Sequence, residues 1–297
     1  MALRLDEQRL SVLEHFKDDE RARAQFNALT EQTFDFNFEQ WYRDGYWGDA
    51  YQPCALVHEG QIVANVSVNH MHFDIDGRSL RAIQIGTAMV DPAFRGRGLA
   101  RFLLERVLHR WQGQCELIYL FANDSVLDFY PRFGFQRVQE HEHVAELLPS
   151  PQPCSFHKVD MGDPLERQRL VHAIDSGAPT ASPAMLHNPQ LLMFYCTASF
   201  KDSVYYSPRH DAYAIVEFED GVMTLYGVIG KSAPHLHVLM AELGTADTRR
   251  VVLGFTPQDT RGFKARRLET DETLFIHGQG AVCADEVKWR FPVLSHA

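Results

Sequence analysis

Residues 90–100 read Val90-Asp91-Pro92-Ala93-Phe94-Arg95-Gly96-Arg97-Gly98-Leu99-Ala100, a polar loop that contains two glycines. The run before it, Leu80 to Val90, is apolar and is typical of a strand. The run after it, Leu99 to Trp111, places apolar residues at helical spacing and predicts an amphipathic helix. The order of strand, loop and helix therefore decides how the first part of the chain folds.

The chemistry of this loop suits a pyrophosphate. Backbone N–H groups at a helix N-terminus have no partner inside the helix and bind anions. Gly96 and Gly98 carry no side chain that would hold a phosphate off, and glycine tolerates positive φ. Arg95 and Arg97 add positive charge, and Ala100 keeps the first helical turn slim. The alternative is an ordinary strand-to-helix loop, which the arginines and the flanking elements make the less favoured interpretation.

The remaining elements of the first half are mostly strands. Strands are predicted at Pro53–Val57, Gln61–Phe73 and Leu117–Ala122, and Asp76-Gly77 predicts a hairpin turn. Helices are predicted over Leu5–Phe16 and Ser125–Phe133, the second stopped by Gly134. The aromatic-rich stretch from Phe34 to Tyr51 fits either core packing or the wall of a substrate site.

A second motif follows the strand predicted at Leu117–Ala122. It begins at Asn123 and continues as Asp128-Phe129-Tyr130-Pro131-Arg132-Phe133-Gly134-Phe135. With both motifs, the sequence resembles the GNAT superfamily of acetyltransferases, whose acetyl-CoA loop reads Q/R-x-x-G-x-G/A. The motif-bearing match covers about Ile62 to Gln139.

The resemblance implies a fold and a site. The fold would be α/β, a mixed and mostly antiparallel sheet flanked by helices. The main chain of Met89 and Val90 would hold the pantetheine arm and the thioester carbonyl of acetyl-CoA, the co-substrate. The pyrophosphate would lie on Arg95, Gly96, Arg97, Gly98, Leu99 and Ala100. Asn123 would contact the pantetheine, and Tyr130 would stand near the sulfur.

Tyr130 is the predicted catalytic residue. A leaving thiolate needs a proton, and a Tyr hydroxyl with a pKa near ~10 can supply one. The alternative is an aromatic packed in the core beside Phe129 and Phe133. The base that collects the proton of the attacking amine stays unassigned. Glu39, Glu59 and Asp74 are candidates, and Gln84 lies on a central strand where some relatives carry an acid.

The proline-rich stretch Leu148–Pro153 predicts a linker between two domains, 1–148 and 154–297. In the second, helices are predicted at Pro164–Asp175 and His235–Leu243, and strands at Tyr213–Phe218, Met223–Val228, Arg250–Phe255, Thr273–His277 and Val287–Phe291. Gly230-Lys231-Ser232 stands where an acyl-CoA loop would be, but it lacks the phosphate pattern. The second domain therefore resembles the degenerate GNAT unit of tandem GNAT proteins, such as the enhanced-intracellular-survival proteins, and is expected to bind no CoA.

The final segment, Phe291–Ala297, is apolar enough that we expect it to dock on the protein. Docking near Tyr130 would let His296 or the Ala297 carboxylate serve as the missing base. Otherwise the segment completes the sheet of the second domain.

The composition of the chain argues against several classes of binding partner. The net charge of −10 argues against nucleic acid. The five cysteines are scattered and form no C-x-x-C pair, which fits a reducing, cytoplasmic setting, and no run is apolar enough for a membrane span. The H-x-H pairs, such as His70/His72, lack further ligands, so no metal is expected.

The expected reaction is direct transfer of an acetyl group from acetyl-CoA to a primary amine of a small molecule or peptide. A homodimer is a further option for the assembly. The alternatives are a regulatory protein that binds acyl-CoA without turnover, a longer acyl group, or an oxygen acceptor.

Overall fold

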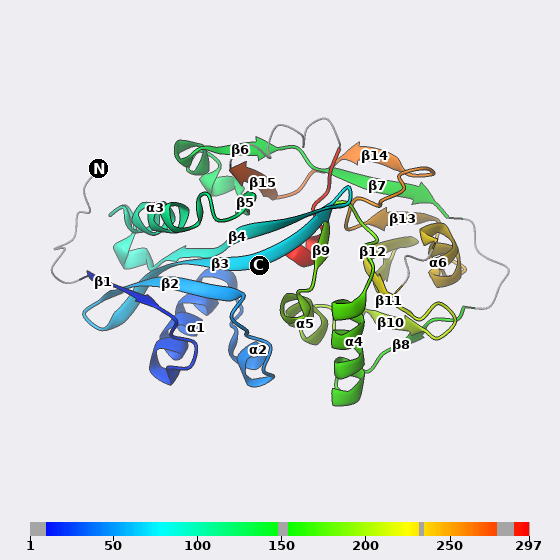
Figure 1. The fold of residues 1–297 in the computed structure, drawn as a ribbon, viewed down its shortest axis with the longest axis horizontal. Coiled ribbons are helices and arrows are strands. Elements are labelled where there is room, and N and C mark those ends of the chain that lie inside the picture. Colours follow the sequence, from blue (N-terminus) through cyan, green and yellow to red (C-terminus); the bar gives the residue numbers. More distant parts are fainter. Residues whose placement is uncertain (1–9, 148–153, 232–234, 278–287, 297) are drawn as a thin grey trace.

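The computed structural model describes residues 10–147, 154–231, 235–277 and 288–296. Two mixed β-sheets lie side by side, with helices against their faces (Figure 1). The first sheet has the order β1 (Leu10–Glu14), β2 (Tyr51–His58), β3 (Gln61–Ile75), β4 (Arg78–Val90), β5 (Leu117–Asn123), β15 (Glu272–His277) and β6 (Phe135–Val138), and β9 (Ala184–Leu186) also pairs with β3. The second has the order β14 (Lys264–Arg267), β7 (His141–Glu146), β13 (Arg250–Leu253), β12 (Val222–Gly230), β11 (Ala212–Glu219), β10 (Val204–Ser207) and β8 (His157–Lys158).

Helices cover both faces of the first sheet (Figure 1). On one face, α3 (Leu99–Trp111) buries its apolar stripe, including Leu99 and Leu103, against the strands. On the other face lie α1 (Glu20–Phe34) and α2 (Glu39–Arg43). In the second half, α6 (Leu236–Leu243) packs on β12 and β13, while α4 (Pro164–Ser176) and α5 (Pro189–Thr197) lie between the sheets. Within the described part of the chain, no helix is long and apolar enough to cross a membrane.

The same strand order occurs twice. In the first half, β3 pairs antiparallel with β4, α3 follows, and β5 returns parallel to β4. In the second half, β11, β12, α6 and β13 repeat this pattern with the same pairings. The predicted echo of architecture between the two halves is therefore confirmed, and both units have the α/β layout expected of GNAT folds.

The two halves exchange strands: the first half gives β7 to the second sheet, and the second half gives β15 and the short edge strand β9 to the first. β7 lies before residue 148 but pairs with β13 and β14 of the second sheet. β15 lies after residue 154 but pairs with β5 and β6 of the first sheet. The division predicted at 148–154 is therefore not the division between the two sheets, and the linker itself lies outside the described residues.

Three predicted elements are wrong in part. Residues 10–14 of the predicted helix Leu5–Phe16 are strand β1, because Leu10 and Val12 alternate onto the apolar core and the segment pairs with β2. The predicted helix Ser125–Phe133 is two short 3₁₀ turns, since Pro131 cannot continue an α-helix. Of the predicted strand Val287–Phe291, Val287 lies outside the described residues, and 288–291 forms no strand.

We predict that a chain truncated after residue 148 does not fold cooperatively. Without β15, the amides and carbonyls of β5 and β6 that face it lose their partners, and Phe275 no longer fills the core around Tyr130. Circular dichroism during urea titration measures this. A sigmoidal unfolding transition of the truncated chain, with the steepness expected for its size, would contradict the account.

Candidate functional site

β4 and β5 separate before either strand ends. Their parallel pairing runs from Ala82 opposite Leu117 to Ile85 opposite Leu120 and then stops. Beyond this point β4 continues to Val90 on the side of β3, and β5 continues to Asn123 on the side of β15. The facing edges of these two strand ends form no ladder with each other, so their backbone donors and acceptors are available to a ligand.

A β-bulge on β4 accompanies the separation. The register with β3 shifts between Asn65 and Ser67, and Thr87 adopts φ +47°. A β-branched residue in this region of φ is strained by about 1–3 kcal/mol. Two hydrogen bonds hold Thr87 there: its hydroxyl lies 2.6 Å from the Tyr51 hydroxyl, and its carbonyl accepts from the Asn65 amide at 3.0 Å.

The loop after β4 presents a row of backbone amides. Asp91 caps a 3₁₀ turn, Pro92–Phe94, by accepting from Ala93 N at 2.8 Å. Gly96 and Gly98 then adopt φ +73° and +84°, with open space where a Cβ would stand. Among the described residues, the amides from 96 to 101 donate to no acceptor. The loop and the first turn of α3 thus offer the anion-binding arrangement of a helix N-terminus.

The two loop arginines lie against the loop itself. Arg95 Nε donates to the Val90 carbonyl at 3.3 Å, and Arg97 donates to the Ala93 carbonyl at 3.0 Å. Arg95 is exposed and Arg97 half-buried, so both charges remain close to the row of amides. Their positive charge favours an anionic ligand at this position.

Asn123 and Tyr130 stand at the end of β5. The side-chain oxygen of Asn123 accepts a hydrogen bond from Ser125 N at 3.1 Å, which leaves the side-chain NH₂ group exposed. The Tyr130 ring is buried against Phe129, Phe135 and Phe275, the last from β15. Its hydroxyl has no hydrogen-bond partner among the described residues, and burial raises its pKa to about 12. The hydroxyl is not among the fully buried unpartnered atoms, so it can take a hydrogen bond from outside the protein.

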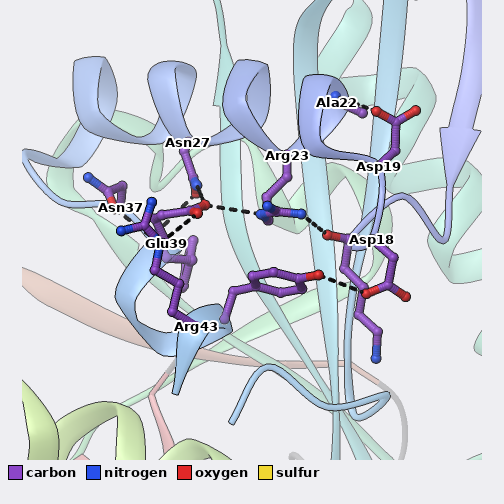
Figure 2. A network of polar contacts seen from close by, with 11 residues as sticks. Asp18, Asp19, Ala22, Arg23, Asn27, Asn37, Glu39 and Arg43 are labelled. Carbon is purple, nitrogen blue, oxygen red and sulfur yellow. Dashed lines mark hydrogen bonds and ion pairs between the residues drawn. The ribbon is translucent and has the colours of Figure 1, made fainter. Parts of the chain in front are cut away.

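The carboxylate of Glu39, a candidate base, is occupied by hydrogen bonds within the protein (Figure 2). Its carboxylate accepts from Arg23 Nε at 3.0 Å, Asn27 Nδ2 at 3.1 Å and Arg43 Nε at 3.1 Å. Arg23 is itself almost fully buried, and its guanidinium lies 3.8 Å from the centre of the Tyr42 ring. The hydrogen bond from Arg23 holds the pKa of Glu39 below its ordinary value. The network joins α1 to α2 and leaves no oxygen of Glu39 for proton transfer.

The other candidates differ in their distance from the strand separation. Asp74 accepts from Gly77 N in the β3–β4 turn, at the opposite end of the hairpin and roughly 20 Å away at ~3.3 Å per residue. Glu59 lies in the exposed turn between β2 and β3. Gln84 is buried on β4 beside Tyr119, next to the last paired residues. Of the candidate carboxylates, Glu39, Glu59 and Asp74, none therefore combines a free oxygen with a place at the separation of the strands.

Most of the aromatic stretch is core. Phe38, Trp41, Trp47 and Tyr51 are at most 5% exposed, and they pack with Phe26 and Met89 on the α1 face. The second half closes this cluster. Trp41 Nε1 donates to the Gln190 carbonyl at 2.9 Å, and the Phe194 ring of α5 packs on Phe38 at 5.6 Å.

A row of buried polar residues on β3 was not predicted from the sequence. Asn65, Ser67 and Asn69 alternate with apolar residues, a pattern typical of a solvent-facing strand side, yet all three are at most 3% exposed. The Oδ1 atom of Asn65 is buried and, among the described residues, has no hydrogen-bond partner. The alternation was a usable signal, but only the packing of α1, α2 and α5 shows that this side is covered.

The corresponding loop of the second half differs from the first. β12 ends at Gly230, α6 begins at Leu236, and Gly230 lies close enough to Asp211 and Ala212 that a Cβ there would be crowded. Ser232 lies outside the described residues. In the part of the chain that the structure describes, no group of three or more His, Cys, Asp or Glu side chains gathers as metal ligands.

Two parallel strands that separate beside a helix N-terminus with unbonded amides form an anion-binding arrangement in a split mixed sheet. The family described as the acetyltransferase (GNAT) domain matches residues 17–138. This segment is therefore a GNAT acetyltransferase domain, which confirms the predicted family.

Solved structures with the same fold span both halves. A probable N-acyltransferase from Enterococcus faecalis is 15% identical, with a TM-score of 0.60 over 90% of this chain and 72% of that one. A GCN5-related N-acetyltransferase from Kribbella flavida is 15% identical, with a TM-score of 0.57 over 90% and 71%. Eis1 from Mycobacterium abscessus is 15% identical, with a TM-score of 0.57 over 89% and 73%. At this identity the likeness establishes the two-unit fold.

We predict that Glu39→Gln lowers the free energy of unfolding by about 1–3 kcal/mol, because it leaves the buried Arg23 guanidinium without its anion. The native pKa of Glu39 is held below its ordinary value of 4.5, so its contribution is complete above that pH and is lost as the pH falls through the native pKa. The melting temperature of the variant should therefore fall less steeply in acid.

Glu105→Gln is the matched control, since Glu105 pairs with Arg101 on the surface with both side chains 50% exposed. An equal loss in both variants would show that the Glu39 network carries no special stability.

Proposed function

We propose that the chain is an acetyl-CoA-dependent N-acetyltransferase that acts on a primary amine of a small molecule or peptide. The proposal rests mainly on one observation. The unbonded backbone amides of residues 96–101 lie in the loop that follows β4, next to the place where β4 separates from β5. A bound acetyl-CoA would supply the activated acetyl group at this place.

The loop and helix would hold the pyrophosphate. Gly96 and Gly98 let a phosphate approach the main chain, and the amides of Leu99 and Ala100 point out of the first turn of α3. Arg95 and Arg97 would exchange their main-chain contacts for phosphate oxygens, which charge-assisted hydrogen bonds favour.

The edge of β4 would hold the pantetheine and orient the thioester. Main-chain groups from Gly86 to Val90 form no ladder with β5. An amide on this edge would stabilise the oxyanion that develops when an amine adds to the thioester carbonyl. Because the Thr87 bulge sets the direction of these groups, its bonds to Tyr51 and Asn65 would keep the donors in position.

Tyr130 would assist departure of the thiolate. With a pKa of about 12, the hydroxyl stays protonated at neutral pH. Full transfer to a thiolate of ordinary basicity, with a thiol pKa near ~8.5, would be uphill by about 5 kcal/mol. Tyr130 would therefore act chiefly as a hydrogen-bond donor to the sulfur in the transition state and release its proton as the C–S bond breaks.

The acceptor would approach from the α1 face of the sheet. The α3 face is lined by the apolar core around Tyr130, which leaves the α1 face for the acceptor. A net charge of −10 favours the approach of a cation. We also propose a cytoplasmic location, in keeping with free thiols at Cys54, Cys115, Cys154 and Cys196.

Gly98→Glu should abolish CoA binding, measured by calorimetry, because a carboxylate would face the pyrophosphate. Gly113→Glu is the matched control: it adds the same charge at φ +81° in open space at the far end of α3, so it imposes the same backbone strain away from the loop. Wild type should bind one CoA per chain. Normal binding by Gly98→Glu, or two CoA per chain, would contradict the assignment.

Tyr130→Phe should keep the affinity for acetyl-CoA and lower kcat by ~10²–10⁴-fold, the usual worth of a general acid. The ring and its contacts with Phe135 and Phe275 remain, so stability should hardly change. Steady-state kinetics on the best amine of a panel measures the effect. Unchanged turnover would remove Tyr130 from the mechanism.

A further inference from the structure

We propose that His296, oriented by Glu272, is the general base that takes the proton of the attacking amine. This inference rests on the proposed acetyl transfer and supplies the one group that it lacks. His296 would be a catalytic residue, and Glu272 a positioning residue that acts through it.

The segment that carries His296 is fixed by contacts with the first sheet, with α5 and with the second half. Tyr119 of β5 donates to the Ser295 carbonyl at 3.0 Å, and Tyr195 of α5 donates to the His296 carbonyl at 2.7 Å. Leu294 and Ser295 are buried. The segment therefore docks, as expected from the sequence, but as a 3₁₀ turn between the two sheets: Val293 N also donates to the carbonyl of Gly254 after β13, and Leu294 packs in the core of the second half. Ala297 lies outside the described residues.

The imidazole lies at the strand separation. Its ring stacks on Phe121 with a centroid distance of 3.4 Å, and Phe121 directly follows Leu120, the last residue of β5 that pairs with β4. Nδ1 lies 3.4 Å from Glu272 Oε2, and Glu272 is the partner of Asn123 across β5 and β15. The imidazole is thus stacked over the part of β5 that has left β4, and Glu272 approaches it from β15, on the other side of β5.

The unused nitrogen of this ring is Nε2. An imidazole that donates through Nδ1 to a carboxylate carries its lone pair on Nε2. Nε2 of His296 is buried and, among the described residues, has no hydrogen-bond partner. A buried acceptor without a donor is costly, so we infer that Nε2 receives its partner from a ligand or a bridging water.

His296 and Tyr130 lie on opposite faces of β5. Ile118, Leu120 and Ala122 face the cluster that contains Tyr130, whereas Tyr119 and Phe121 point to the other face, where His296 stacks. Addition to a thioester needs a proton acceptor on the side of the amine and a donor on the side of the sulfur. A thioester in the space between β4 and β5 would have one of these groups on each side.

The step balances as follows. The amine nitrogen forms a bond to the carbonyl carbon, and its proton passes to Nε2 of His296 directly or through one water. The C–S bond then breaks, and the thiolate accepts a hydrogen bond and finally the proton from Tyr130. His296 returns its proton to solvent and Tyr130 regains one, so the products are the amide and free CoA.

Several ionisable groups surround the imidazole. The hydrogen bond with His296 holds the pKa of Glu272 below its ordinary value. Burial raises the pKa of Glu140, and the charge of His296 opposes that rise. The ionisable groups that face His296 or its neighbours are Glu272 on β15, Glu140 after β6, Tyr119 on β5, Tyr195 on α5 and Arg290. The positive charge of Arg290 also lowers the pKa of Glu140. Carboxylates therefore face the imidazole from β15 and from the segment after β6.

The test compares four variants in the full-length chain, between about pH 5 and about pH 9, the fourth being His296→Ala for rescue by imidazole. His296→Phe keeps a ring on Phe121 and both main-chain carbonyls but removes the base. Glu272→Gln removes the charge that orients the imidazole. Tyr195→Phe, the control, removes one bond to the docked segment and leaves the imidazole in place. The readouts are kcat/KM for the best amine of a panel, hydrolysis of acetyl-CoA without amine, and CoA affinity by calorimetry.

We expect His296→Phe to lower kcat/KM by ~10²–10⁴-fold with CoA affinity unchanged. Glu272→Gln should move the acid limb of the profile to lower pH, because the ring loses the carboxylate that lies 3.4 Å from Nδ1. Tyr195→Phe should keep the shape of the profile. Added imidazole should restore part of the rate to His296→Ala, since truncation opens the place of the ring on Phe121.

Two results would overturn the assignment alone: full activity of His296→Phe, or reduced activity with an unshifted acid limb in Glu272→Gln and no rescue by imidazole. In both cases wild type still transfers acetyl groups, so the proposed function stands. If wild type binds acetyl-CoA but neither transfers nor hydrolyses the acetyl group, the proposed function fails and the base assignment fails with it.

Discussion

The hydrogen-bond ladders that β15 forms with β5 and β6 are the contacts on which the rest of the structure depends. They place a strand from the second half inside the first sheet, while β7 makes the reciprocal exchange. β5 is thereby held on the side of β15, and it can part from β4 without becoming a free edge. Separation of two neighbouring strands inside a sheet is costly unless each keeps another partner, and here each does.

The exchange also joins the second half to the chemistry. Phe275 of β15 packs on the Tyr130 ring, Glu272 stands at the start of the same strand, and α5 covers the aromatic cluster behind Met89. In the proposed enzyme the second half would matter for catalysis without binding a cofactor, because it would complete the walls of the site. This explains why its own loop after β12 can differ from that of the first half while its architecture is retained.

Local features could be predicted from the sequence, and non-local ones could not. The loop from Arg95 to Ala100 and helix α3 were predictable because glycines, arginines and helical periodicity act within a few residues. β1 was misassigned because five residues fit a short helix as well as an edge strand. The positive φ of Thr87 and the strand exchange depend on partners such as Tyr51 and β15 that lie far away along the chain. The local sequence around Thr87 and β15 contains no pattern that predicts either feature.

The central claim is that the co-substrate lies between β4 and β5 with its phosphates on α3, and amide hydrogen exchange with and without CoA tests it most directly. The amides from 96 to 101 have no acceptor among the described residues, so they should exchange fast in the free protein and slow on binding. Gly86 to Val90 should gain protection as well, and the loop after β12 should not change. Protection confined to the second half, with none at 96–101, would contradict the account.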